Sequence, residues 1–216
     1  MEYDMITEFI VVRHGETDAN LNKTLQGQLD TPLNPLGIRQ AEKTAERLRH
    51  ETFDYIFSSD LGRAMKTAEL IAAPHRLPVV SLRALREWNL GTLQGRKWEE
   101  LRTQYPEIIE AFKQEASDVP VPGGESRQDL NIRVADCLDE LADRYAGKRI
   151  LLVAHGGSLK AMFRHVVGTV SEYSRLPLTD NASVSAFRHI DGFWQLISWN
   201  DTAHLRGLGA NESVVF

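Results

Sequence analysis

Cysteine is almost absent from this sequence, which contains only Cys137. One cysteine cannot close an internal disulfide, and its place in an amphipathic stretch predicts a buried structural thiol rather than a nucleophile. No apolar run approaches the roughly 20 residues that a membrane-spanning helix needs. The first residues, MEYDMITEFIVV, are acidic where a signal peptide is basic. These absences favour a cytoplasmic protein with no membrane partner.

An excess of positive charge is also missing, because 25 Lys and Arg stand against 30 Asp and Glu, a formal net charge of −5. Such a chain offers no broad electrostatic surface for nucleic acid or for an anionic membrane. An anionic ligand would therefore need local basic contacts. The 216 residues, 42% of them hydrophobic, suffice for the core of one domain, so we expect a single domain over residues 1–216.

Two continuous apolar segments, residues 8–14 (EFIVVRH) and 149–155 (RILLVAH), predict buried parallel strands. Each segment ends in His followed by Gly. Residues 53–57 predict a shorter strand. Near the end of the chain, SVSAFRHI and FWQLISWN alternate enough to be strands, and Asp191 with Gly192 predicts the turn between them.

Helical stripes alternate with these strands, over residues 38–48 and again over residues 61–72. Asn34 before Pro35 predicts a helix N-cap, and Ser126 with Asp129 predicts a capping box. Alternating strands and helices predict the α/β class, as a three-layer α/β/α sandwich with a mostly parallel sheet. Ligands bind such sheets at the carboxyl ends of the strands.

The segment 98–122 is more polar than its surroundings and predicts helix plus loop. We expect it to be an insertion that forms one wall of the site, rather than a second domain.

The end of the first predicted strand carries Arg13, His14 and Gly15. A neutral imidazole is a competent nucleophile near pH 7, because its unperturbed pKa is about 6.5 and no separate base is needed to activate it. The guanidinium of Arg13 can bind two phosphoryl oxygens through its fork. The triplet therefore suits phosphoryl transfer, although a histidine at a strand end is by itself a weak signal.

The Arg-His-Gly triplet is the first part of a longer pattern. Six segments occur in this order along the chain: RHGETDAN, LQGQLDTPLNPLGIRQA, SSDLGRAMKTA, RALREWNLGTLQG, PGGES and VAHGGSL. From about residue 9 to residue 205 the chain resembles the histidine phosphatase superfamily, also called phosphoglycerate mutase-like. The resemblance implies a phosphohistidine enzyme of that fold, with His14 as the nucleophile and Arg13, Arg63 and His155 as the phosphate pocket. It also implies phosphate contacts from Asn20, Gln26 and the backbone near Gly27 and Gly156.

A pocket of two arginines and a second imidazole fits a reaction that is catalysed mainly by positioning and by neutralising charge, so we expect no metal or other cofactor. Arg63 is expected in the first turn of a helix that begins near Leu61, where backbone N–H groups favour an anion. The leaving alkoxide needs a proton. Glu87 matches the family's acid position and is expected at the end of a short strand formed by LRAL, residues 82–85.

A cofactor-dependent phosphoglycerate mutase is the nearest alternative. Mutases resemble ERHYGxLxG after the acid, whereas this chain reads EWNLGTLQG, so Trp88 and Leu90 replace Arg and Tyr. Arg96 and Lys97 could contact a substrate but do not restore that pattern. We therefore expect the mouth of the phosphate pocket to be less cationic and more apolar than that of a mutase. Such a pocket favours hydrolysis of a small phosphomonoester over transfer of the phosphoryl group.

Two alternatives come from other classes: a metallohydrolase that uses His14, Glu16 and His155, and a catalytically silent domain that binds a phosphorylated ligand. Arginines beside the histidines argue against a cation, and the presence of both His14 and Glu87 argues against silence. We expect the remaining histidines to be structural or solvated. It stays open whether His204 closes over the pocket, whether the chain is a monomer or a homodimer, and which small phosphomonoester is the substrate.

Overall fold

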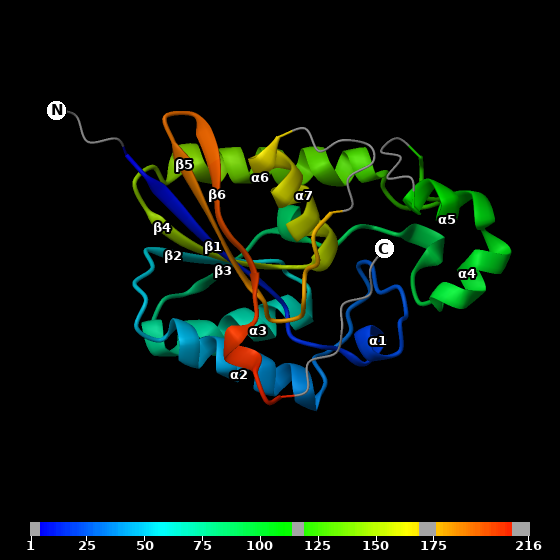
Figure 1. Ribbon diagram of the computed structural model, residues 1–216, viewed down its shortest axis with the longest axis horizontal. Helices are drawn as coiled ribbons and strands as arrows, with labels where there is room; N and C mark the ends of the chain where they lie inside the picture. Colours follow the sequence, from blue (N-terminus) through cyan, green and yellow to red (C-terminus); the bar gives the residue numbers. More distant parts are fainter. Residues whose placement is uncertain (1–4, 114–118, 169–175, 209–216) are drawn as a thin grey trace.

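The computed structural model describes residues 5–113, 119–168 and 176–208. These residues form a fold that is built around one six-stranded sheet (Figure 1). The order across the sheet is β3-β2-β4-β1-β5-β6. The neighbours β3, β2, β4 and β1 run parallel, while β5 pairs with β1 and β6 pairs with β5 in the antiparallel direction. The strands are β1 (Thr7–Arg13), β2 (Tyr55–Ser58), β3 (Val79–Ser81), β4 (Arg149–Ala154), β5 (Val184–Ile190) and β6 (Phe193–Asp201).

Helices cover both faces of this sheet, with α2 and α3 on one side and α6 and α7 on the other (Figure 1). The helices are α1 (Asp18–Leu21), α2 (Pro35–Leu48), α3 (Gly62–Ala72), α4 (Trp98–Gln104), α5 (Pro106–Lys113), α6 (Arg127–Arg144) and α7 (Gly156–Val167). Short 3-10 turns cover Ala73–His75, Arg83–Leu85, Gly91–Leu93 and Ala203–Leu205. The predicted three-layer α/β/α arrangement with a mostly parallel sheet is confirmed.

The two central strands bring the predicted histidines together. In the parallel register of β1 and β4, Arg13 lies opposite Ala154, so His14 and His155 follow at adjacent points of the sheet edge. The backbone N–H of His14 donates to the carbonyl of Ala154 at 3.0 Å, which extends the pairing one step past the strand. The continuous apolar runs of both strands are buried on both faces, as parallel strands between helical layers require.

The predicted helix caps, the hairpin turn and the buried cysteine are all present in the structure. The side chain of Asn34 accepts from the Gly37 N–H at 2.8 Å and so caps α2. Ser126 and Asp129 form the reciprocal capping box of α6. The β5–β6 turn contains Asp191 with φ +50° and Gly192 with φ +82°, the left-handed pair that a two-residue hairpin of type I′ requires. The thiol of Cys137 is buried, and burial raises its pKa to about 11, as expected for an inert cysteine.

The expected strand over residues 82–85 is wrong. The strand lies earlier, at Val79–Ser81. The backbone N–H of Leu82 then donates the last hydrogen bond between this segment and β2, to the carbonyl of Ser58 at 2.8 Å. Beyond Leu82 no strand continues alongside, because β2 ends at Ser58. Arg83–Leu85 therefore closes into a 3-10 turn, which turns the chain toward the edge of the sheet where Glu87 lies.

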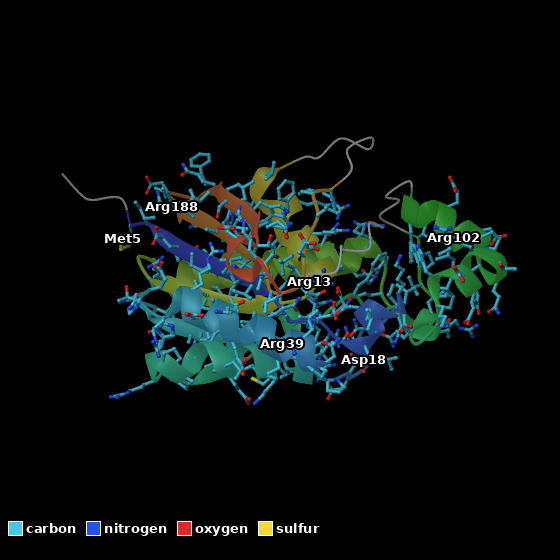
Figure 2. The ribbon with its side chains drawn as sticks, turned by 60° about the horizontal axis from the view of Figure 1, so that its bottom comes forward. Met5, Arg13, Asp18, Arg39, Arg102 and Arg188 are labelled. Atoms are coloured by element: carbon cyan, nitrogen blue, oxygen red, sulfur yellow. The ribbon has the colours of Figure 1, made fainter. Side chains whose placement is uncertain are left out.

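The segment that begins at residue 98 forms α4 and α5, which stand apart from the sheet at one end of the molecule (Figure 2). Leu101, Ile109, Phe112 and Val121 of this segment form an apolar cluster with Leu25, Leu90 and Leu93. Residues 114–118 lie outside the described residues. Within the described parts of the chain, no helix is both long and apolar enough to cross a membrane.

Candidate active site

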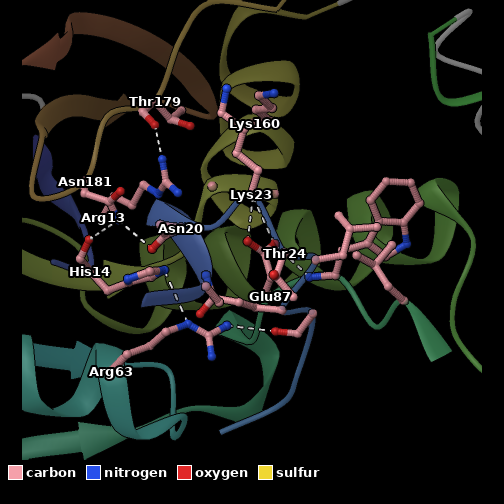
Figure 3. A pocket seen from close by; sticks show the side chains of 18 of the residues that line it. Arg13, His14, Asn20, Lys23, Thr24, Arg63, Glu87, Lys160, Thr179 and Asn181 are labelled. Carbon is pink, nitrogen blue, oxygen red and sulfur yellow. Dashed lines mark hydrogen bonds between the residues drawn. The ribbon is translucent and has the colours of Figure 1, made fainter. Parts of the chain in front are cut away.

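A pocket opens where the carboxyl ends of β1 and β4 meet, and its lining includes most of the predicted site residues (Figure 3). Figure 2 shows Arg13 at this end of β1, with Met5 at the other. The predicted residues that line the pocket are Arg13, His14, Asn20, Gln26, Gly27, Arg63, Glu87 and Gly156. His155 is fully buried and does not line the pocket, but its ring centroid lies 5.0 Å from that of His14.

The ring of His14 has a defined orientation. Its Nδ1 atom lies 2.6 Å from the carbonyl oxygen of Gly15, which can only accept, so Nδ1 carries the proton and Nε2 keeps its lone pair. Arg63 Nε donates to this Nε2 at 3.3 Å, in agreement with the same tautomer. Burial lowers the pKa of His14 well below its usual range, and the charges of Arg63 and Arg13 lower it further. Near pH 7 the ring is therefore neutral, with its basic nitrogen on the side of Arg63.

Gly15 is needed at the turn after His14 because the start of α2 lies against it. A Cβ atom on Gly15 would lie 2.3 Å from the carbonyl oxygen of Gly37, which is main chain and cannot move aside. The backbone N–H of Gly15 donates to Thr67 Oγ1 at 3.2 Å, which ties the same turn to α3. The loop that holds His14 is thus clamped between two helices.

Two arginines border His14 from different elements, Arg63 buried and Arg13 partly buried. Arg63, in the first turn of α3 as predicted, donates to the carbonyls of Gly27 and Leu29 at 2.8 and 2.7 Å, and these bonds aim its guanidinium past His14 (Figure 3). Arg13 donates through Nη1 to the carbonyl of Thr179, while its Nε is buried with no protein partner among the described residues. Burial lowers the pKa of Arg63 to about 10, so both arginines remain charged at neutral pH.

His155 is held by Ser59. The His155 Nε2 and Ser59 Oγ atoms are 2.8 Å apart, and Ser59 Oγ also accepts from the Leu61 N–H at 3.3 Å. The hydroxyl hydrogen can then be donated to Nε2, which leaves the proton of a neutral imidazole on Nδ1. This Nδ1 is buried with no hydrogen-bond partner among the described residues. Burial, followed by the charge of Arg63, lowers the pKa of His155 well below its usual range.

The amide of Asn20 is oriented by its neighbours. Its oxygen accepts from the Thr17 N–H at 3.2 Å and lies 3.0 Å from the Thr17 hydroxyl. Asn181 Nδ2 donates to the same oxygen at 3.3 Å and to the His14 carbonyl at 3.0 Å. With its oxygen engaged in this way, Asn20 presents its NH₂ group, a donor, on its other side. Sequence analysis missed Asn181, since it follows no recognised motif and comes from the loop before β5.

The carboxylate of Glu87 lies against the N-terminus of α7, although Glu87 itself belongs to the loop before Trp88. Its Oε1 accepts from the backbone N–H groups of Trp88 at 2.8 Å and Gly157 at 2.9 Å. The loop beneath it is held by Arg133 of α6, which donates to the carbonyls of Ala84 at 2.7 Å and of Arg86 at 3.1 Å. The carboxylate that the sequence proposed as an acid is therefore fixed in the same pocket as His14.

Further cations that the sequence analysis did not single out reach the pocket. They are Lys23, Arg127, Lys160 and Arg164. Among the residues that the structure describes, the lining contains six Lys or Arg, Arg13 and Arg63 included, and two carboxylates, Glu16 and Glu87. The described lining is therefore rich in cations, although Trp88 and Leu90 replace the Arg and Tyr of the mutase pattern. Trp88 does stand where mutases have Arg, but the guanidinium of Arg127 lies 5.0 Å from its ring centroid and supplies a cation from α6.

Three other residues that the sequence singled out, Arg96, Lys97 and His204, lie outside the pocket lining. Arg96 donates to Gln104 and stacks on Tyr105, and neither Arg96 nor Lys97 belongs to the pocket lining. His204 lies against α2, with its Nε2 3.1 Å from Thr44 Oγ1, and it too is outside the lining. Burial lowers the pKa of His204 to about 4, so this ring is neutral. In the described chain, the segment that carries His204 packs on a helix instead of covering the pocket.

The residues of the metallohydrolase alternative have other neighbours. Glu16 Oε1 accepts from Asn34 Nδ2 at 2.8 Å, and the basic nitrogen of His14 faces the guanidinium of Arg63. Across residues 5–113, 119–168 and 176–208, no group of three or more His, Cys, Asp or Glu is placed to hold a metal ion. The charge arrangement around His14 suits an anion.

Known proteins share this arrangement of sequence and fold. Residues 9–202 match the family model of the histidine phosphatase superfamily (branch 1). The chain is 38% identical to phosphoglycerate mutase-like protein 4 of Arabidopsis thaliana over 95% of its own length and 90% of the relative's. It is also 38% identical to a metal-independent phosphoserine phosphatase of the same plant, over 94% and 85%.

Among solved structures, a mycobacterial glucosyl-3-phosphoglycerate phosphatase superposes with a TM-score of 0.82 at 32% identity, over 91% of this chain and all of that one. The resemblance inferred from the motifs is thus confirmed over nearly the whole length. This chain belongs to the histidine phosphatase superfamily.

Proposed function

We propose that this enzyme hydrolyses small phosphomonoesters through a phosphohistidine formed on His14, without a metal ion. The observation that carries the proposal is the tautomer of His14: Nδ1 is bound to the Gly15 carbonyl, and Nε2 is a neutral, basic nitrogen beside two arginines. An unprotonated nitrogen next to fixed positive charge is what attack on a phosphate dianion requires. The membership of the family and its phosphatase relatives support the same reaction.

In the first step, His14 Nε2 attacks phosphorus and the bond from phosphorus to the ester oxygen breaks. We assign the equatorial oxygens to Arg13 and Arg63, with the amide of Asn20 as a further donor. His155 lies behind the lining, but its ring is next to that of His14 and its Nδ1–H has no partner among the described residues, so we assign it to the same group. Gln26 and the backbone at Gly27 and Gly156 border the same space. Glu87, protonated at this stage, gives its proton to the leaving oxygen, so an alcohol departs.

In the second step, a water molecule attacks the phosphohistidine and the bond from phosphorus to nitrogen breaks. Glu87, now a carboxylate, takes a proton from that water, so inorganic phosphate forms and Nε2 regains its lone pair. Each residue thus returns to its starting state. The Gly157 N–H holds the Glu87 carboxylate at 2.9 Å while it is charged.

The proposal is tested by hydrolysis of p-nitrophenyl phosphate and a panel of phosphomonoesters in EDTA, by the wild type and by His14→Ala. We expect phosphate release that His14→Ala abolishes, and an acid-labile, base-stable label on the wild-type protein after a quench with ³²P-labelled substrate. Turnover that persists in His14→Ala, or that EDTA abolishes, would overturn the mechanism. If a folded wild type hydrolyses none of these esters, the proposal fails and the silent binding domain becomes the better reading.

Phosphoglycerate mutase activity is the second candidate, and the similarity to a phosphoglycerate mutase-like protein supports it. The two reactions share the first step and differ in what accepts the phosphoryl group. Incubation with 3-phosphoglycerate and 2,3-bisphosphoglycerate separates them: a hydrolase releases phosphate, whereas a mutase produces 2-phosphoglycerate without phosphate.

Three further expectations remain predictions. We propose that residues 98–122 act as a wall within one domain of residues 1–216, with support from Trp98 and Phe112, which line the pocket. The cytoplasmic location stays a prediction from the sequence, as does the choice between monomer and homodimer.

A further inference from the structure

The loop before β5, residues 178–182, contacts the active site at two positions. The carbonyl of Thr179 accepts from Arg13 Nη1, and Asn181 Nδ2 donates to the carbonyl of His14 at 3.0 Å. Thr179 and Asn181 both line the pocket, and Figure 3 shows them beside Arg13. The loop before β5 therefore determines how the nucleophile and its neighbouring guanidinium are oriented.

The C-terminal part of β6 binds the same loop at other residues. The indole N–H of Trp199 donates to the carbonyl of Leu178 at 2.8 Å. The side chain of Asn200 pairs with Asp180 twice, because its oxygen accepts from the Asp180 N–H at 2.6 Å and its NH₂ group donates to the Asp180 carboxylate at 2.7 Å. Asn200 has a φ of +53°, a left-handed conformation that asparagine tolerates better than most residues. The strand thus ends in a turn that grips the loop.

His204 holds the last residue of the loop, Ala182. The Nδ1 atom of His204 lies 3.0 Å from Arg47 Nη1, which can only donate, so the proton of this neutral ring is on Nε2. Nε2–H donates to the carbonyl of Ala182 at 3.1 Å. Ala182 has a φ of +58°, which alanine rarely adopts and which persists only where surrounding contacts impose it. Its N–H donates to the carbonyls of Arg13 at 3.1 Å and His14 at 3.2 Å.

The two sets of contacts alternate along the loop. Residues 178, 180 and 182 are bound by Trp199, Asn200 and His204, whereas residues 179 and 181 line the pocket. The three side chains that bind the loop lie outside the lining, so their effect on a ligand must pass through the loop.

We propose that Asn200 and His204 are positioning residues for the reaction, which act by clamping the loop before β5 against the active site. Thr179 and Asn181 then keep the donors for the equatorial oxygens, the amide of Asn20 included, aligned with the phosphoryl group. The inference rests on the proposed function and adds to it two residues from outside the pocket lining. A misplacement of about 1 Å costs about 100-fold in rate at such a site, so a partial release of the loop should be measurable.

Inhibition by vanadate separates positioning from folding. Vanadate takes the five-coordinate geometry of phosphoryl transfer, so its Ki reports how well the site is arranged for the transition state. A variant that is only less folded contains less active enzyme, which lowers the apparent kcat but leaves KM and the Ki for vanadate unchanged. A variant with a released loop should raise this Ki.

His204→Leu removes the donor to the loop and keeps an apolar side chain. We expect kcat/KM for p-nitrophenyl phosphate to fall, and the Ki for vanadate to rise, by about tenfold or more. His204→Gln, whose amide can donate in place of Nε2–H, should restore most of both. Asn200→Gly removes the other contact while suiting the positive φ, and should act in the same direction.

His165→Leu is the matched control. His165 is a partly buried histidine of α7 whose Nε2 lies 2.8 Å from Asp139 Oδ1, and it lies outside the pocket lining. We expect this variant to leave the Ki for vanadate unchanged. A double-mutant cycle tests the route, because in an Asn181→Ala background His204→Leu should cost less than in the wild type.

The outcomes separate this inference from the proposed function. If the wild type hydrolyses p-nitrophenyl phosphate and folded His204→Leu and Asn200→Gly keep its Ki for vanadate within about threefold, the phosphatase stands and the clamp is overturned. A lower kcat with unchanged KM and Ki would overturn the clamp as well, as would full additivity with Asn181→Ala. If the wild type hydrolyses no ester, p-nitrophenyl phosphate included, the proposed function fails and this inference fails with it.

Discussion

The carboxylate of Glu87 occupies the space that a side chain on Gly157 would fill. A Cβ atom on Gly157 would lie 2.2 Å from Glu87 Oε1, the same oxygen that accepts the Gly157 N–H at 2.9 Å. The second glycine of the HGG sequence is therefore explained by the proposed acid, which comes from a segment 70 residues away in the chain.

Gly157→Ala should displace that carboxylate. Because alanine is a better helix former than glycine, we expect α7 and the fold to persist, while kcat/KM for alkyl phosphates falls about 100-fold or more, as for loss of a positioned general acid. A double-mutant cycle checks the cause: in a Glu87→Ala background, Gly157→Ala should cost little more. Full additivity of the two losses would show that the alanine acts through something other than Glu87.

Glu87→Gln keeps the shape of the side chain but cannot deliver the proton. In kcat/KM, which reports the steps up to formation of the phosphohistidine, we expect a loss of about 100-fold or more for alkyl phosphates. For p-nitrophenyl phosphate, whose leaving group departs without protonation, the loss should be less than about tenfold. Equal losses for the two classes of leaving group would count against Glu87 as the acid.

His14 should be neutral well below pH 6.5. Its pKa is lowered by burial and by Arg63 and Arg13, so protonation, which would block attack, sets in only at more acidic pH. The ring can be followed by ¹⁵N nuclear magnetic resonance, with His14→Gln to assign the signals. At pH 6.5 we expect a protonated Nδ1 and an unprotonated Nε2. A doubly protonated ring at that pH would contradict the proposed nucleophile.

The part of the site that lies at strand ends could be predicted from the sequence. Continuous apolar runs identify buried parallel strands, and the residues after them must meet at one edge of the sheet, as His14 and His155 do. Arg63 was also predictable, because a first helical turn after a strand faces the same edge.

Other contributions depend on packing that no local pattern encodes. Asn181 reaches the His14 carbonyl from a loop with no recognised motif. Arg127 enters the pocket because α6 begins beside Trp88, and this proximity is set by how two distant segments dock. The error over residues 82–85 has a similar origin, since an apolar segment becomes a strand only where a neighbouring strand continues beside it.

The separate apolar cluster of α4 and α5 has a consequence for how such an enzyme diversifies. His14 and His155 follow β1 and β4, the innermost strands, whereas α4 and α5 pack in a cluster with Leu25, Leu90 and Leu93. Substitutions in α4 and α5 can therefore reshape the side of the pocket that Trp98 and Phe112 line, without loosening the strands that hold the imidazoles. Selection can retune the range of accepted esters there while the phosphoryl chemistry is inherited unchanged.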